Sequence, residues 1–305
     1  MADDLILMKL GGSVITNKKS QTPKCRRENI TRIAEIISKS NKKIIIVHGA
    51  GSYAHPLAKK YKISNGLDGT DEQLEAIIKA KKQMRELNQL LCTSIAEAGL
   101  DCESIIPSIS MKINRENEPI DFPKGKFDEI ISIGKIAVTF GDIVDTKENN
   151  VGILSGDTLL LRLAELYKPK RTFFVMDYPG VVKGRLDADV IEIHNKINSK
   201  FVNNVSIHNE GDRPDVTGGL LNKIKCALEI SNYSECWISG LDNLDDCLNG
   251  IPKGMENSYQ GNPVVVINLT YDAGIGGGSD IQGSMIIALS IADAVHGRRS
   301  HNYNS

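Results

Sequence analysis

The sequence has no excess charge of either sign, which excludes two classes of protein at once. Among its 305 residues, 37 Lys and Arg face 38 Asp and Glu, and 41% of the residues are hydrophobic. Nucleic-acid-binding proteins typically carry a basic excess, and disordered chains combine high net charge with few apolar residues. We therefore expect no nucleic-acid partner and a folded chain, built as one large α/β domain or two modest ones.

Cysteine pairs and long apolar runs are also missing. None of the six cysteines belongs to a C-x-x-C pair, and no histidine cluster lies beside one. Disulfide frameworks occur in short secreted chains, and zinc sites need closely spaced ligands. We expect reduced thiols and no metal-binding side chains. No apolar run approaches the roughly 20 residues that span a bilayer, and the start of the chain is acidic rather than basic. The expectation is a soluble, cytoplasmic protein that does not act at a membrane.

Short apolar runs alternate with helical patterns along the chain. Buried strands are predicted at Leu5–Met8 and Lys43–Val47, with a helix around Ile30–Ile37 between them. A long helix is predicted from Asp71 to Ala98, with Thr70 and Gln73 at capping-box spacing. Further strands are predicted at 104–106, 136–140, 172–176, 236–238 and 264–269, and further helices at 158–166, 220–230 and 243–248. This alternation is typical of a largely parallel sheet covered on both faces.

Two segments interrupt the alternation, and one follows it. The stretch Met111–Asp121 is predicted to form a hairpin, and Asp145–Val151 a second turn between short strands. Near the C-terminus, Gly274–Ser279 predicts a flexible joint that leads into an appended helix. The apolar face of that helix would consist of Met285, Ile286, Leu289, Ile291 and Ala292.

Three glycine loops follow predicted strands directly. They are Lys9-Leu10-Gly11-Gly12-Ser13, His48-Gly49-Ala50-Gly51-Ser52 and Ser155-Gly156-Asp157. A loop that surrounds a phosphate needs glycine, because a Cβ would block the approach of backbone amides. In an open α/β sheet, ligands bind beyond the carboxyl ends of the strands, so the three loops can converge. Any one loop alone is explained by an ordinary tight turn, whereas the three together with nearby lysines favour phosphate binding.

Several common phosphate-binding motifs are absent from the sequence. There is no G-x-x-x-x-G-K-[ST] loop, no complete dinucleotide fingerprint and no protein-kinase signature. What remains is a site built from glycine loops and the lysines Lys9, Lys18 and Lys223. Taken singly, Lys18 and Lys223 would be interpreted as solvated surface residues. A lysine near the start of a helix opposes the helix dipole, which an intervening anion would relieve.

These motifs, taken in order, resemble a known family. They are Lys9-Leu10-Gly11-Gly12-Ser13 with Thr16-x-Lys18, the second glycine loop followed by His55-Pro56, Gly141-Asp142, Ser155-Gly156-Asp157, and Asp215-Val216-Thr217-Gly218-Gly219-x-x-x-Lys223. From about Leu5 to Gly254 the chain is similar to the amino-acid kinase superfamily, and within it most similar to the isopentenyl phosphate kinases. The resemblance implies a three-layer αβα sandwich with a mostly parallel sheet, a homodimer, and the use of ATP and Mg²⁺. It implies conversion of isopentenyl phosphate to isopentenyl diphosphate in an archaeal-type mevalonate route.

The resemblance also implies a role for each matching residue. Lys18 would stabilise charge on the transferred phosphoryl group, and Asp157 would orient Lys9 and Lys18. His55 would donate a hydrogen bond to the acceptor phosphate, with Ala50 and Gly156 as further acceptor contacts. The implied ATP-binding residues are Lys9, Leu10, Gly11, Gly12, Ser13, Gly51, Asp177, Gly219 and Lys223. The acceptor would bind to the N-terminal part, about 1–165, and the nucleotide to about 166–270. Residues 271–305 would form the joint and appended helix, of unknown role.

Other interpretations remain open at this point. Where the family commonly has two aspartates after a strand, this chain has Asp177-Tyr178-Pro179, which leaves nucleotide preference undecided. A kinase for fosfomycin or another small phosphate or phosphonate would use the same chemistry. A carboxylate kinase has no use for His55, and a non-catalytic nucleotide-binding regulator has none for Lys18.

His48 is interpreted as structural, and Asp142 and Asp145 as turn residues. Four apolar residues of the long helix could line an acceptor pocket or form ordinary core, namely Ile77, Ile78, Met84 and Leu87.

Overall fold

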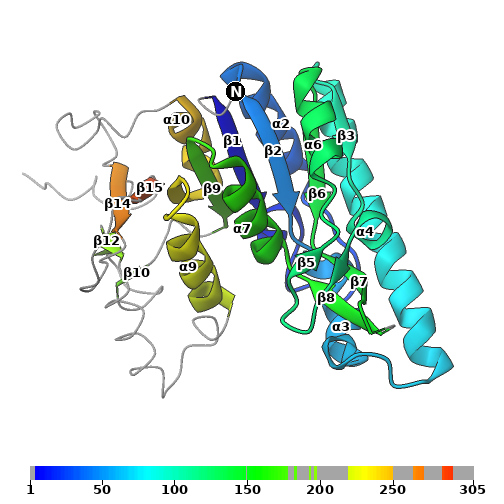
Figure 1. Cartoon of the computed structure of the whole chain (residues 1–305). Coiled ribbons are helices and arrows are strands. Elements are labelled where there is room, and N and C mark those ends of the chain that lie inside the picture. Colours follow the sequence, from blue (N-terminus) through cyan, green and yellow to red (C-terminus); the bar gives the residue numbers. More distant parts are fainter. Residues whose placement is uncertain are drawn as a thin grey trace, which may run out of the picture.

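The structure is a computed structural model that describes residues 4–148, 150–177 and 219–249. It also describes the backbone of short strands at 182–183, 192–193, 196–197, 264–270 and 284–290. A nine-stranded sheet runs through the molecule in the order β12-β14-β15-β13-β9-β1-β2-β6-β3 (Figure 1). Neighbouring strands pair in parallel except for the antiparallel pair β14 and β15. The predicted, mostly parallel sheet is confirmed.

The strands of this sheet follow the apolar runs of the sequence. Their bounds are β1 (Leu5–Leu10), β2 (Lys43–His48), β3 (Cys102–Ser104), β6 (Ile136–Phe140), β9 (Arg171–Met176), β12 (Lys196–Ile197), β13 (Glu235–Gly240), β14 (Val264–Thr270) and β15 (Ser284–Ser290). The central strands β1, β2, β6 and β9 are buried almost throughout, as expected for parallel strands covered on both faces.

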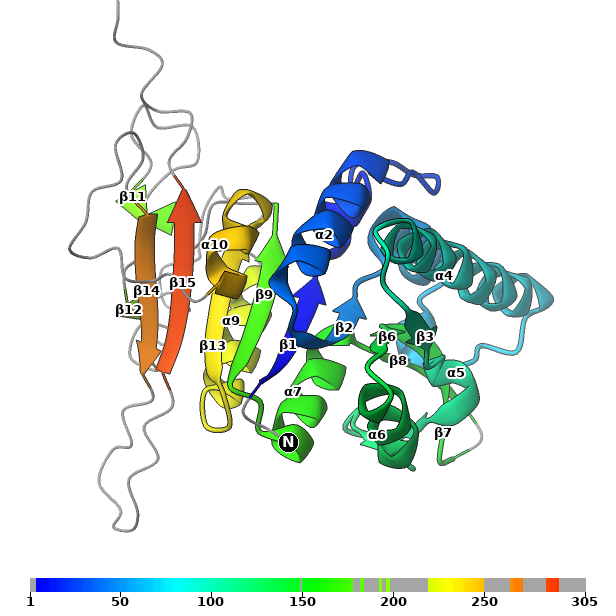
Figure 2. The ribbon, with the colours of Figure 1, turned by 90° about the horizontal axis from the view of Figure 1, so that it is seen from above.

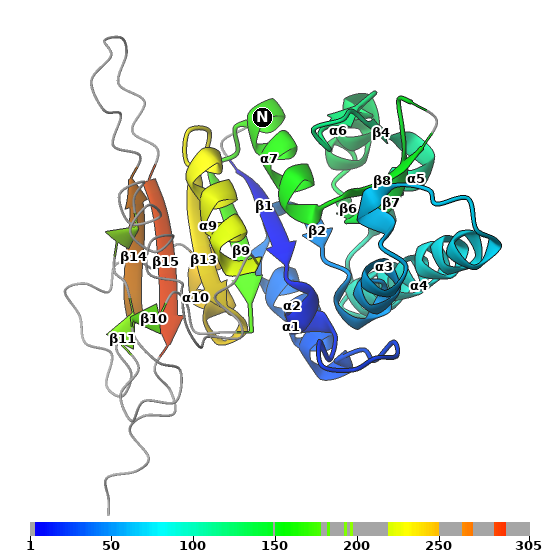
Figure 3. The same ribbon diagram turned by 90° about the horizontal axis from the view of Figure 1, so that it is seen from below.

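Helices cover both faces of the sheet. One layer contains α2 (Arg27–Ser40), α4 (Asp71–Glu97) and α10 (Leu244–Asn249); the other contains α6 (Lys124–Ser132), α7 (Gly156–Tyr167) and α9 (Gly219–Ile230). Figure 2 shows α2 and α4 on one side of the sheet and α6 and α7 on the other, and Figure 3 gives the opposite view. The result is the three-layer αβα sandwich that the resemblance implied. In the part of the chain that the structure describes, no helix is both long and apolar enough to cross a bilayer.

The alternation of side chains along β1 decides which layer each residue faces. Leu5 and Leu7 join the core cluster under α6, α7 and α9, whereas Ile6 and Met8 join the cluster under α2 and α4. Successive side chains of a strand point to opposite faces of the sheet. Lys9 follows the odd-numbered set, so the sequence directs its side chain toward the α7 layer.

The two main predicted helix starts form with caps. Thr70 Oγ1 accepts a hydrogen bond from the Gln73 amide at 3.3 Å at the start of α4. The Gln73 side chain accepts instead from the Asp68 amide at 2.8 Å, so only half of the predicted capping box forms. At α7, Ser155 Oγ accepts from the Thr158 amide at 3.0 Å. These caps fix the helix starts that flank the glycine loops.

The two predicted interruptions form a small separate sheet with the order β5-β4-β7-β8. Strands β4 (Lys112–Ile113) and β5 (Pro119–Ile120) pair antiparallel, as do β7 (Asp142–Thr146) and β8 (Val151–Leu154). The hairpin and the second turn are therefore confirmed. Two further short strands, β10 (Val182–Lys183) and β11 (Glu192–Ile193), pair with each other.

One element prediction is wrong and another is displaced. Residues Ser284–Ser290 form strand β15, which lies between β13 and β14, rather than part of an appended helix. A short continuous apolar run fits a strand with neighbours on both sides as well as it fits a buried helix, and periodicity cannot separate the two. Strand β3 occupies Cys102–Ser104 instead of 104–106. The Gly274–Ser279 joint, Ile291, Ala292, Pro179 and Gly254 lie outside the described residues.

Candidate active site

Four neighbouring strands end at the same level, and each continues into a glycine or an aspartate. Leu10 pairs with His48 and with Val175, and His48 pairs with Phe140. The backbone amide of the glycine after each of three strands continues the hydrogen bonding between neighbouring strands. Gly11 N donates to Val175 O at 2.9 Å, Gly49 N to Leu10 O at 2.9 Å, and Gly141 N to His48 O at 3.1 Å. The predicted convergence of loops at the carboxyl ends of the strands is thus observed.

The first two glycine loops pack backbone against backbone. A Cβ on Gly12 would lie 2.4 Å from the Gly51 nitrogen, and one on Gly49 would lie 2.8 Å from the Gly12 nitrogen. Gly51 has φ +49°, and a Cβ there would meet the Thr16 hydroxyl at 1.9 Å. Both the close approach and the left-handed backbone require glycine. Gly12, Gly49 and Gly51 are therefore needed for the close contact between the two loops, whether or not a phosphate binds there.

Thr16 joins the two loops. Its buried hydroxyl donates to Gly12 O at 2.7 Å and accepts from the Ser52 amide at 3.0 Å. Ser52 Oγ in turn accepts from the Lys24 amide at 3.1 Å. Helix α1 (Gly12–Ile15), the 3-10 turn η1 (Gly51–Tyr53) and the loop between α1 and α2 are thereby held as one unit. Thr16 belongs to the motif that carries the family resemblance, but no local pattern indicates that it bridges the two loops.

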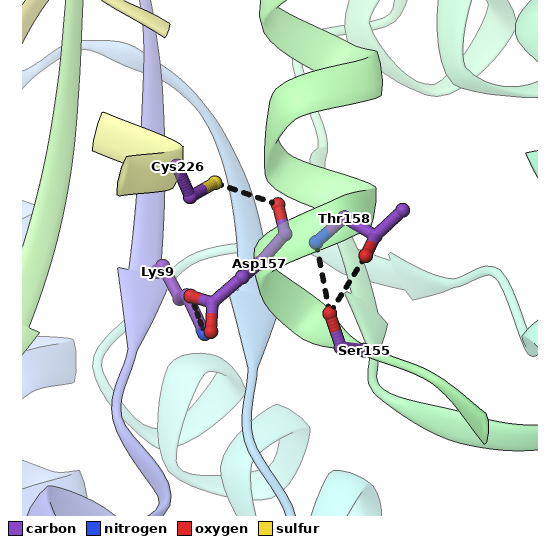
Figure 4. Close-up of polar contacts among 5 residues, drawn as sticks. All are labelled: Lys9, Ser155, Asp157, Thr158 and Cys226. Atoms are coloured by element: carbon purple, nitrogen blue, oxygen red, sulfur yellow. Dashed lines mark hydrogen bonds and ion pairs between the residues drawn. The ribbon is translucent and has the colours of Figure 1, made fainter. Parts of the chain in front are cut away.

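The third loop brings a carboxylate to Lys9. The Lys9 ammonium donates to an Asp157 carboxylate oxygen, and Lys9 is only 5% exposed (Figure 4). Burial alone would raise the pKa of Asp157, but the charges of Lys9 and Lys223 lower it below its ordinary value. A Cβ on Gly156 would lie 3.3 Å from Lys9 Cε, so glycine also leaves room for the lysine. The predicted pairing of Asp157 with Lys9 is present.

Helix α9 adds a second lysine and a thiol to this pair. Burial lowers the pKa of Lys223, and the positive charge of Lys9 lowers it further, while Asp157 opposes both effects. Cys226, one helical turn further along, donates from Sγ to Asp157 O at 3.3 Å (Figure 4). The sequence analysis treated Cys226 only as a reduced thiol, since nothing in its local pattern indicates this contact. Gly219 is the first residue of α9, and the preceding residues 215–218 lie outside the described chain.

His55 begins α3 (His55–Lys60) and is followed by Pro56, a residue favoured in the first turn of a helix. Its ring is exposed, but the surrounding protein displaces part of the water that would solvate a charge. This loss of hydration lowers the pKa of His55, and the positive charges of Lys223, Lys18 and Lys9 lower it further. His55 is therefore mainly neutral at pH 7, with one ring N–H available as a donor.

Asp177 follows β9 and reaches the first glycine loop. Ser13 Oγ donates to Asp177 Oδ1 at 2.6 Å, which joins the start of α1 to the end of β9. Asp177 is exposed. Both residues were predicted to contact the nucleotide, and the structure places them side by side.

The structure thus gathers the predicted charged residues from separate parts of the chain. Mutual electrostatic effects connect Lys9, Lys18, His55, Asp157 and Lys223. Lys18 lies in an exposed turn between α1 and α2, and Ala50 and Gly51 form the second loop beside Gly12. Three lysines and a histidine around one carboxylate leave an excess of positive charge. Such an arrangement can bind and align phosphate groups.

Three other predictions concern residues that lie away from this cluster. His48 is fully buried, stacks on Phe140 with ring centroids 5.0 Å apart, and lies on the α4 side of the sheet. Asp142 and Asp145 belong to strand β7 rather than to a turn, so their interpretation as turn residues is wrong. Asp142 has a structural role, because it accepts from the Ser108 amide at 3.1 Å and from the Ile143 amide at 2.9 Å. Ile77, Met84 and Leu87 belong to the core cluster, whereas Ile78 is 68% exposed. The interpretation as core residues is correct for those three.

Comparison with known proteins matches most of the chain. A family model described as the amino acid kinase family matches residues 4–238. The isopentenyl phosphate kinase of Methanothermobacter thermautotrophicus is 28% identical over 234 residues, covering 72% of this chain and 85% of that protein. The isopentenyl phosphate kinase of Methanocaldococcus jannaschii is 30% identical over 231 residues, with the same two coverages.

The fold has a matching solved structure. A structure titled "X-ray structures of isopentenyl phosphate kinase" superposes with a TM-score of 0.66 at 25% identity, covering 81% of this chain and 96% of that one. The similarity thus extends over almost the whole length of that protein. Similarity by sequence and by structure therefore leads to the same group of proteins.

Proposed function

Because this chain belongs to the amino acid kinase family, we propose that it transfers the γ-phosphoryl group of ATP to isopentenyl phosphate. The product would be isopentenyl diphosphate. The observation that supports this proposal best is the grouping of His55 with Lys9, Lys18 and Lys223 beside the glycine loops. The similarity to two archaeal isopentenyl phosphate kinases also supports it, and fits an archaeal-type mevalonate route.

The acceptor explains why this site has donors and cations rather than a general base. A phosphate monoester has a second pKa near 6 and is mostly dianionic at pH 7, so no proton has to be removed before attack. The enzyme must instead bring two anions together in line and neutralise their charge. His55, kept neutral by its surroundings, donates from its ring N–H to an acceptor phosphate oxygen. The Ala50 and Gly156 backbone lies beside the same position.

The lysines share the charge of the two phosphate groups. We assign Lys9 and Lys223 to ATP phosphates, and Lys18 to the charge that builds up on the transferred group. Asp157 forms an ion pair with the Lys9 ammonium and so keeps this charge at a fixed position in the site. Since Asp157 is already paired with Lys9, it acts as a positioning residue rather than a base. An attacking oxygen of the acceptor then forms a bond to the γ-phosphorus as the bond to the ADP oxygen breaks.

The nucleotide occupies the C-terminal part of the domain in this proposal. Asp177 after β9, Gly219 at the start of α9, and Lys223 contribute from about 166–270, whereas His55 and Ala50 contribute from about 1–165. The first glycine loop, from Leu10 to Ser13, lies between the two parts and contacts the transferred phosphate. The homodimer and the cytoplasmic location stay predictions from the sequence.

We propose that Mg²⁺ enters this site bound to the phosphates of ATP. Among the residues that the structure describes, no three His, Cys, Asp or Glu side chains are close enough together to hold a metal ion. Mg²⁺ typically keeps several waters and binds through phosphates with only one or two carboxylates. A donor set of lysines and backbone amides suits such a complex. Once bound, the ion would neutralise part of the phosphate charge.

An acceptor panel tests the proposed function. Purified protein with Mg²⁺ and ATP is given isopentenyl phosphate, dimethylallyl phosphate, fosfomycin or a carboxylate acceptor, and ADP formation is followed together with ³¹P NMR of the products. We expect the highest kcat/KM for isopentenyl phosphate, with a new diphosphate signal.

Each of the other outcomes contradicts the proposal in its own way. A preference for fosfomycin identifies a phosphonate kinase, and a preference for the carboxylate removes the argument from His55. Absence of ADP formation with all acceptors, in a protein that still binds ATP, identifies a regulator that kept the fold.

A further inference from the structure

Two cysteines lie together on the face of the sheet opposite the Lys9 cluster. Cys92 belongs to α4, and Cys102 is the first residue of β3, the edge strand beside that helix (Figure 2). Cys102 Sγ lies 3.7 Å from the Cys92 carbonyl oxygen, so the Cys102 side chain lies against the helix residue that carries the other thiol. Both residues are partly exposed, so a small reagent can reach them.

A chain of polar contacts surrounds this pair. Cys92 Sγ lies 3.3 Å from Ser104 Oγ, which accepts a hydrogen bond from Asn88 Nδ2 at 2.6 Å. Asn88 in turn interacts with the buried His48 ring at the end of β2. The thiols therefore have polar partners between α4 and the sheet, in addition to their packing against the apolar core on that side. Such contacts can support a thiolate, which apolar surroundings would disfavour.

We propose that Cys92 and Cys102 form a reversible intramolecular disulfide by exchange with a low-molecular-weight disulfide such as oxidised glutathione. This site of modification is independent of the proposed kinase function. In the first step the Cys92 thiolate attacks one sulfur of glutathione disulfide, whose S–S bond breaks and releases one glutathione thiolate. In the second step Cys102 loses its proton to solvent and attacks the Cys92 sulfur, which releases the second glutathione. The protein gives up two electrons and two protons, and one glutathione disulfide becomes two thiols.

The surroundings of the two thiols determine which cysteine attacks the glutathione disulfide first. Interactions with Cys102 and Ser104 outweigh the partial burial of Cys92 and lower its pKa to about 7, so a large fraction is thiolate at neutral pH. The pKa of Cys102 is raised by its interaction with Cys92, by burial and by the negative charge of Cys92. Once Cys92 is in a mixed disulfide that negative charge is gone, which makes ionisation of Cys102 easier. Cys92 is therefore the attacking residue and Cys102 the resolving one.

Thiol titration and peptide mapping test the proposal on the full-length protein. Wild-type protein is incubated with oxidised glutathione, quenched with acid, and analysed by DTNB titration and by mass spectrometry of its peptides. We expect a loss of two titratable thiols, a peptide pair linked through Cys92 and Cys102, and full reversal by dithiothreitol. Cys102→Ser should accumulate a glutathione adduct on Cys92, and Cys92→Ser should form neither the adduct nor the disulfide. Cys25→Ser, which changes another partly exposed thiol, should behave as wild type.

Three results would overturn the proposal. They are an unchanged thiol count, a stable glutathione adduct on wild-type Cys92 without the linked peptides, or a disulfide that joins two chains. Because the wild-type peptide map decides between these results, the conclusion does not depend on the serine variants folding. Circular dichroism of the reduced variants checks their fold separately.

Discussion

At the scale of single residues, Lys18 lies in an exposed turn that backbone hydrogen bonds stabilise. It lies in a turn in which the Ser20 amide donates to Asn17 O at 3.0 Å and the Asn17 amide to Lys24 O at 2.8 Å. Its positive charge affects both His55 and Lys223, which come from α3 and α9. An exposed lysine held in this way can meet charge on a phosphoryl group between the acceptor and nucleotide sides without being needed for the core.

Replacing Lys18 should therefore impair catalysis more than binding. We expect Lys18→Ala to lower kcat by about 100-fold, the order of magnitude lost with one transition-state donor, while the Kd of ATP changes little. Steady-state kinetics with isopentenyl phosphate and calorimetric titration of ATP measure the two effects. Lys19→Ala is the matched control, because Lys19 is an exposed neighbour with the same charge, and it should keep near wild-type kcat. A kcat that is equal in the two variants would remove Lys18 from the mechanism.

At the residue scale, the direction of a side chain follows from the sequence where a local rule decides it. Alternation along β1 places Lys9 on the α7 layer, where Asp157 begins the helix, and alternation along β2 turns His48 to the opposite layer. The contacts of Cys226 with Asp157 and of Ser13 with Asp177 join residues that are far apart in sequence. No local pattern contains that information, because it depends on which elements become neighbours.

At the scale of elements, the first two glycine loops act as a unit because Thr16 bridges them. Replacing its hydroxyl with a methyl group would leave the partly buried Gly12 carbonyl and the buried Ser52 amide without this partner. We expect Thr16→Val to lower the free energy of unfolding by about 1–3 kcal/mol and to raise the KM of ATP, because the first loop loses its support. Urea denaturation and steady-state kinetics measure the two effects.

The control for this prediction is Thr16→Ser, which keeps the hydroxyl and loses only a methyl group. Its KM for ATP should stay close to that of wild type. If serine and valine raise the KM equally, the methyl contact is responsible for the effect and the hydroxyl bridge is not.

Elements were predictable where a boundary has its own chemistry. Thr70 caps α4 as its spacing from Gln73 indicates, and α7, capped by Ser155, begins two residues before its predicted start at 158. Strand β15 was missed because its seven residues have no cap, turn or periodicity that separates a strand from a helix. Its identity depends on its place between β13 and β14, which only the assembled sheet provides.

At the scale of the whole molecule, the sequence predicted the layers and the edge of the sheet at which the candidate site lies. Strand–helix alternation requires parallel strands covered on both faces, and parallel strands bring their carboxyl ends to one edge. The strand order does not follow from the alternation. For example, β9 lies beside β1 although they are far apart in sequence. It is this crossover that brings Asp177 and α9 to the first glycine loop.

The stability of the whole molecule should depend on pH through His48. Complete burial lowers the pKa of His48 from its ordinary 6.5 to about 4, although the contact of Nδ1 with the Gly49 carbonyl and the nearby Asn88 side chain act in the opposite direction. Between these two pH values the unfolded chain binds a proton at this ring and the folded chain does not. Stability therefore falls as the pH decreases from 6.5 to about 4. The contribution of His48 to this loss is about 3 kcal/mol, from 1.36 kcal/mol per pKa unit.

The comparison with His48→Gln isolates that contribution, because glutamine does not titrate while all other groups remain. Urea denaturation of both proteins across this range gives the free energy of unfolding at each pH. We expect the wild type to lose about 3 kcal/mol more than the variant on acidification. A variant that is folded at neutral pH and follows the wild-type curve in parallel would mean that the ring takes up a proton in the folded state. The neutral, structural role assigned to His48 would then be wrong.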